Sequence, residues 1–161
     1  MKVLLLGMGN PILSDDGVGL FIARELEKSL LGVDVSTTAM AGLEVLELIR
    51  GYDRIFVIDA STMKKCEPGK IVKFNHEENS CVHLFSSHGL NFFELLCLGK
   101  KLGYVMPSVE GVYGIEIGDE VCFGCGLTRH LKEKFELIAR SIAEDIRACL
   151  SRWKNEAEVQ G

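Results

Sequence analysis

Long apolar runs and clusters of basic residues are both missing from this sequence. No hydrophobic stretch approaches the roughly 20 residues that span a bilayer, so we expect no membrane insertion. The net charge is −5, and Lys and Arg are spread along the chain, which argues against a nucleic-acid partner. The first residues carry one Lys and a short apolar run without a small-residue cleavage site. They therefore predict a strand and not a signal peptide, and hence a cytoplasmic protein.

The sequence also lacks linkers, internal repeats and low-complexity stretches. Its 161 residues fit one domain, and a hydrophobic content of 47% is enough for a substantial core. We assign residues 1–150 to a single α/β domain and residues 151–161 to a charged, frayed C-terminal tail. The six cysteines are scattered, and in a cytoplasmic protein they are expected to be reduced thiols.

Short apolar runs alternate with amphipathic stretches along the whole chain. Period-two and fully apolar runs predict strands, and apolar residues spaced three or four apart predict helices. The predicted strands cover residues 3–6, 33–38, 54–59, 71–74 and 108–117, and the predicted helices cover 15–31, 43–49, 90–102 and a long segment that Thr128 caps. This order predicts an α/β fold with a twisted, mainly parallel sheet of about five strands and helices on both faces.

Three residues with metal-binding side chains follow predicted strands. Asp16 comes after the first strand, Asp59 ends the third, and His88 begins the helix after the fourth. Open α/β sheets bind ligands at the carboxyl ends of their strands, and two carboxylates with one imidazole suit zinc, nickel or a similar divalent ion. Each residue also has a structural interpretation: Asp16 as compensation of a helix dipole, Asp59 as a strand-end carboxylate and His88 as a helix-start residue.

The opening segment GMGNPI resembles the start of a dinucleotide fingerprint, but the third glycine is absent and position 12 is Ile. Phosphate binding uses the free N–H groups and positive potential of a helix N-terminus. Asp15 and Asp16 would place negative charge there and repel a phosphate. A lone Gly-x-Gly is in any case a weak signal, so nucleotide binding is a minor alternative.

The pair Cys122 and Cys125, with His130 close behind, is compatible with half of a zinc site or a redox dithiol. A structural zinc site usually needs a fourth ligand and a second paired motif, and the sequence places none well. A thioredoxin-like motif normally begins a helix, whereas this pair precedes one by several residues. We therefore interpret both cysteines as incidental members of a Gly-rich loop. A Gly-x-Ser-x-Gly turn for serine catalysis is also absent.

Several short motifs follow one another in a recognisable order. GMGNPILSDDGVG at 7–19 is followed by AGLE at 41–44, Asp59-Ala60, Pro68-Gly69, SHGL at 87–90, GIE at 114–116 and GLT at 126–128. With this ordered set the sequence resembles the hydrogenase maturation endopeptidases, which trim the C-terminal extension from the large subunit of nickel–iron hydrogenases. The resemblance extends to about residue 150.

The resemblance implies a metal-dependent endopeptidase whose partner is a nickel–iron hydrogenase large-subunit precursor. By that resemblance Asp16, Asp59 and His88 are the expected catalytic and metal-contacting residues, and Asp15 is a candidate second carboxylate for proton transfer. The metal is expected to be nickel that the precursor carries, with no tightly bound intrinsic cofactor. The alternative is a metal-binding maturation chaperone of the same fold that docks on the precursor without cleaving it.

Overall fold

The central sheet is built from the apolar runs of the sequence, in the order β2-β1-β3-β5-β4. The computed structural model describes residues 1–39, 42–62, 66–74, 92–118, 122–124 and 126–159. The strands are β1 (Val3–Met8), β2 (Asp34–Thr38), β3 (Arg54–Ser61), β4 (Ile71–Phe74) and β5 (Ser108–Glu116). β1, β2, β3 and β5 are parallel, and β4 pairs antiparallel with β5 at one edge. The predicted mainly parallel five-stranded sheet is confirmed.

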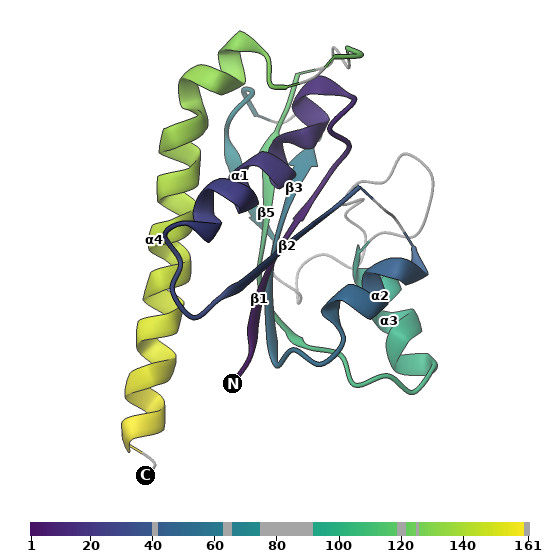
Figure 1. Cartoon of the computed structure of the whole chain (residues 1–161), viewed down its shortest axis with the longest axis vertical. Coiled ribbons are helices and arrows are strands. Elements are labelled where there is room, and N and C mark those ends of the chain that lie inside the picture. Colours follow the sequence, from purple (N-terminus) through teal and green to yellow (C-terminus); the bar gives the residue numbers. More distant parts are fainter. Residues whose placement is uncertain (40–41, 63–65, 75–91, 119–121, 125, 160–161) are drawn as a thin grey trace.

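Helices cover both faces of this sheet. α1 (Val18–Glu27) and α4 (Arg129–Val159) lie against one face, and α2 (Leu43–Ile49) and α3 (Phe92–Lys101) against the other (Figure 1). Because both faces are covered, the central strands are apolar on both sides, which is typical of parallel sheets. Successive residues of a strand point to opposite faces. In β3, Phe56 and Ile58 accordingly join the core under α1 and α4, whereas Val57 joins the core under α2 and α3.

The final helix is longer than the sequence predicts, because α4 continues to Val159. Trp153 is only 5% exposed, and its ring stacks on that of Phe56 with 5.9 Å between the centroids. The guanidinium carbon of Arg54 lies 4.3 Å from the Trp153 ring centroid. The prediction of a frayed tail from residue 151 is therefore wrong for 151–159. The other side chains of 151–159 are exposed, and four of them are charged, so the buried ring of Trp153 is what holds the last turns against the sheet.

Two further observations concern the described residues only. No helix among them is long and apolar enough to cross a membrane. Cys66, Cys97, Cys122 and Cys149 are free thiols, as predicted.

Candidate active site

The loop after β1 turns back on itself so that Asp16 lies beside the strand end. Gly9 has a φ of 138°, and a Cβ at this position would overlap the carbonyl oxygen of Asp16, so only glycine fits. The backbone N–H of Asn10 donates to Asp16 Oδ2 over 2.8 Å. The Asn10 side chain in turn accepts a hydrogen bond of 3.0 Å from the Ile12 N–H. Asn10 therefore fixes both the loop and the Asp16 carboxylate.

The predicted helix over 15–31 begins differently from the expectation. Residues Ser14–Gly17 form a short 3-10 helix, η1, before α1 starts at Val18. Gly19, in the first turn of α1, packs directly on the sheet. A Cβ on Gly19 would overlap the carbonyl oxygen of Met8 and lie 2.5 Å from that of Ile58. This close approach holds η1, and Asp16 with it, beside the carboxyl ends of β1 and β3.

Asp59 lies inside β3, which continues for two more residues, and it is only 5% exposed. Its Oδ1 accepts a hydrogen bond of 2.8 Å from the Ala60 N–H. Burial raises the pKa of Asp59 well above its usual range; the Ala60 hydrogen bond opposes this shift, and the nearby charge of Asp16 adds to it. Partial burial likewise raises the pKa of Asp16, against the opposing hydrogen bond from Asn10. The structure thus brings two of the predicted carboxylates close enough to repel each other.

Asp15 points away from this pair and binds the start of α4. Its Oδ1 accepts a hydrogen bond of 2.7 Å from the Thr128 N–H, and its Oδ2 accepts one of 2.8 Å from the Thr128 hydroxyl. Thr128 Oγ1 also lies 3.5 Å from the N–H of Leu131, in the capping position predicted for it. Asp15 therefore links the loop of Asp16 to α4 with both of its oxygens. Its expected part in proton transfer stays a prediction.

A buried polar pair near Asp59 was not identified from the sequence. The Ser61 hydroxyl donates to Glu116 Oε2 over 3.2 Å, and the two residues are 0% and 1% exposed. Ser61 is two residues beyond Asp59 in β3, so both side chains point to the same face of the sheet. The sequence feature that could have indicated this pair is Glu116 itself, because it is a carboxylate at the end of an otherwise apolar run.

The third predicted ligand, His88, lies outside the described residues, as does Cys125. Within the described part of the chain, no group of three or more His, Cys, Asp or Glu side chains could hold a metal ion. Cys122 is exposed on its loop. The described residues therefore supply the two carboxylates of the predicted set, and the role of His88 stays a prediction.

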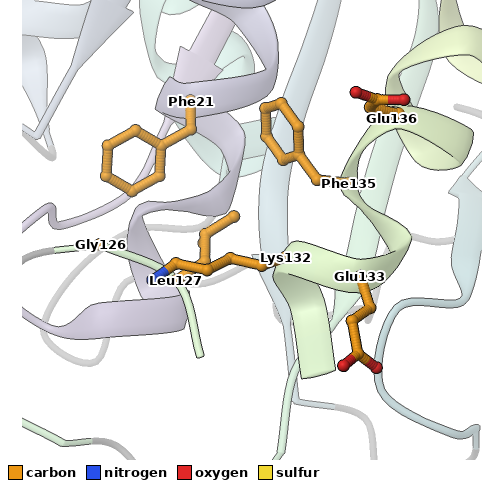
Figure 2. Close-up of a pocket in the computed structure, with 7 residues that line it drawn as sticks. All are labelled: Phe21, Gly126, Leu127, Lys132, Glu133, Phe135 and Glu136. Atoms are coloured by element: carbon orange, nitrogen blue, oxygen red, sulfur yellow. The ribbon is translucent and has the colours of Figure 1, made fainter. Parts of the chain in front are cut away.

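An apolar pocket lies between α1 and the first turns of α4. Its volume is about 420 Å³, and Figure 2 shows Phe21 of α1 and Phe135 of α4 on either side of it. The lining residues are Phe21, Gly126, Leu127, Lys132, Glu133, Phe135 and Glu136. The pocket contains neither Asp16 nor Asp59, and it lies on the sheet face opposite to the Asp59 side chain. It is therefore separate from the carboxylate pair.

Comparison with known proteins finds relatives in sequence. The sequence model of the hydrogenase maturation protease family matches residues 22–145. The hydrogenase 2 maturation protease of Escherichia coli strain K12 is 30% identical over 130 residues, covering 71% of this chain and 79% of that protein.

Two solved structures share the fold. The E. coli hydrogenase maturating endopeptidase HybD aligns with a TM-score of 0.73 and 24% identity, over 92% of this chain and 94% of its own. The [NiFe] hydrogenase maturation protease HybD from Thermococcus kodakarensis aligns with a TM-score of 0.62 and 25% identity, over 91% of this chain and 99% of its own.

Proposed function

Because the chain belongs to the hydrogenase maturation protease family, we propose that this protease removes the C-terminal extension from the large-subunit precursor of a nickel–iron hydrogenase. The observation that carries the proposal is the pairing of Asp16 and Asp59 at the carboxyl edge of the sheet. Binding sites of open α/β sheets occur at this edge. Two close carboxylates there repel each other when both are ionised, and a cation beside them relieves that repulsion.

We further propose that the cation is nickel already held by the precursor, and that His88 is its third contact on this chain. The Asn10 N–H orients Asp16 and the Ala60 N–H orients Asp59. Among the described residues the second oxygen of each carboxylate accepts no hydrogen bond, so these oxygens are the ones we assign to the metal. A substrate-borne nickel ion supplies a Lewis acid that can polarise the carbonyl or activate water. A precursor without nickel lacks the cation that the two carboxylates would contact. Cleavage therefore follows only after nickel insertion.

The decisive experiment compares one precursor prepared with and without nickel. We expect the protein to shorten the nickel-loaded precursor, as read by mass spectrometry of its C-terminus, and to leave the nickel-free precursor intact. Equal cleavage of both preparations would contradict the role of nickel. Tight binding of the loaded precursor without any change in its mass would indicate a non-cleaving maturation chaperone instead.

The site residues are tested by Asp59→Asn, which keeps the shape of the side chain and the acceptor for the Ala60 N–H. The buried carboxylate is costly to ionise, since burial raises its pKa. The neutral amide should therefore melt at a higher temperature than the wild type at pH 7, while trimming of the loaded precursor is lost. Normal trimming by this variant would show that Asp59 does not contact the metal. His88→Ala and Asp16→Asn are expected to lose trimming in the same way.

We also propose that the isolated protein holds no tightly bound metal. Two carboxylates and one imidazole form a weak nickel site when the thiolates of the substrate are absent. Metal analysis after dialysis should find nickel far below one ion per chain. A stoichiometric ion that survives dialysis would contradict the model of a substrate-borne metal.

A further inference from the structure

Two large apolar side chains are exposed, one on the segment that leads to Asp16 and one on the loop that is hydrogen-bonded to that segment. Phe123 is 87% exposed and Ile12 is 61% exposed. Single apolar side chains on a protein surface are common and need no explanation. These two differ because they come from distant parts of the sequence, and backbone hydrogen bonds join their loops just before Asp16 in the chain.

Backbone hydrogen bonds hold the two loops together. Leu13 and Gly124 form an isolated parallel β-bridge. The Gly124 N–H donates to the Ile12 carbonyl over 3.0 Å, and the Ser14 N–H donates to the Gly124 carbonyl over 3.2 Å. Ser14 adopts a φ of 47°, which is uncommon for a residue other than glycine. The pairing of the loops thus sets the position of Phe123 relative to Ile12.

The same contacts connect these side chains to the site. Asn10 holds Asp16 through its backbone N–H and holds Ile12 through its side-chain oxygen. Ser14, next to Asp15, also donates its hydroxyl to the Gly126 carbonyl over 3.0 Å. A chain that packs on Ile12 and Phe123 is therefore adjacent to the metal-binding carboxylate.

We propose that Ile12 and Phe123, the rim patch, dock apolar side chains of the hydrogenase precursor next to the bond that is cleaved. This inference rests on the proposed function. A protease that acts on one folded protein needs affinity from outside the scissile bond, and exposed aromatic anchors commonly supply it. The precursor is the favoured occupant because the patch is continuous with the site. An anionic membrane surface is disfavoured, since the chain carries a net charge of −5.

The test measures trimming kinetics of the nickel-loaded precursor for Phe123→Ser and Ile12→Ser. Losing the burial of one large apolar side chain predicts a KM about tenfold higher or more, with kcat unchanged. Direct binding to the precursor, measured in an Asp59→Asn background that does not cleave, should weaken by a similar factor. Circular dichroism should be unchanged, because both side chains are exposed.

Matched controls are Leu31→Ser and Val105→Ser, whose parent side chains are 92% and 88% exposed. Both residues precede strands and so lie toward the opposite edge of the sheet from the site. These two control variants also remove exposed apolar surface, and they should leave KM and kcat at wild-type values.

The outcomes separate the two proposals. If the wild type does not trim the loaded precursor, the proposed function fails. If the wild type trims and the rim variants keep the KM of the controls, the docking inference is wrong. Rim variants that lose kcat but keep the wild-type KM would also overturn it. The inference is wrong too if the wild type is a dimer, the rim variants are monomers and KM does not change.

Discussion

Gly19→Ala tests whether the close packing of α1 on the sheet sets the geometry of the carboxylate pair. A Cβ at residue 19 would overlap the Met8 carbonyl oxygen and lie 2.5 Å from the Ile58 carbonyl oxygen. Both neighbours are strand backbone, so neither can rotate away. The helix would have to retreat by about 0.5 Å or more to reach the 3.0 Å that such contacts require.

Two effects of this substitution oppose each other. Alanine is a better helix former than glycine by about 1 kcal/mol, which alone would stabilise the protein. Overpacking a close contact costs about 1–3 kcal/mol, and here the clash is with rigid backbone on two strands. We therefore expect the free energy of unfolding to fall by about 0.5–2 kcal/mol. A 1 Å misplacement can slow a reaction about 100-fold, so half of that shift predicts a kcat about tenfold lower.

Urea unfolding followed by circular dichroism measures the first effect, and mass spectrometry of the trimmed precursor measures the second. Gly118→Ala is the control, because among the described residues a Cβ there would meet only Pro68 Cγ, at 4.0 Å, and the φ of Gly118 is not positive. That variant should resemble the wild type in both assays. If Gly19→Ala is as stable and as active as the wild type, the packing of α1 does not set the site geometry.

Two further substitutions test the long helix α4. Trp153→Ala removes a buried ring from the last turns of α4 and should lower the free energy of unfolding by about 3–5 kcal/mol. The measured effect is a lower Tm. A loss below about 1 kcal/mol would contradict an anchoring role for Trp153. At Asp145, partial burial favours a higher pKa, but hydrogen bonds from Lys73 and Tyr113 outweigh it and hold the pKa of Asp145 below its ordinary 3.8. The resulting stabilisation is present above pH 3.8 and is lost as the pH falls through the lower folded value. Asp145→Asn should therefore be less stable than the wild type at pH 7, and the difference should disappear in acid; a difference that persists unchanged in acid would refute the assignment.

The positions of the two carboxylates could be predicted from the sequence because Asp16 follows one apolar run and Asp59 ends another. Carboxyl ends of parallel strands meet at one edge of a sheet, so Asp16 and Asp59 were expected to approach each other, and they do. The hydrogen bonds of Asp15 to Thr128 could not be predicted from the sequence. Thr128 is more than a hundred residues away, and only the folded chain shows that both oxygens of Asp15 are bound there.

The buried residues of α4 show the same division. The repeat of Leu131, Phe135, Ile138, Ile142 and Ile146 predicts one apolar helix face. Four of these residues are buried, whereas Phe135 is partly buried and lines the pocket between α1 and α4. Trp153 continues that face among charged neighbours, where local composition indicates a solvated tail. Only the packing of its ring on Phe56 decides that the helix extends to Val159.

Local sequence thus determined most of the strands and helices, the family motifs and the edge of the sheet at which Asp16 and Asp59 lie, because apolar periodicity and glycine turns act over a few residues. Tertiary structure decided the rim patch, the Ser61–Glu116 pair and the Asp15–Thr128 link. Each of these depends on hydrogen bonds between segments far apart in the chain, and no local pattern specifies which distant backbone groups will meet.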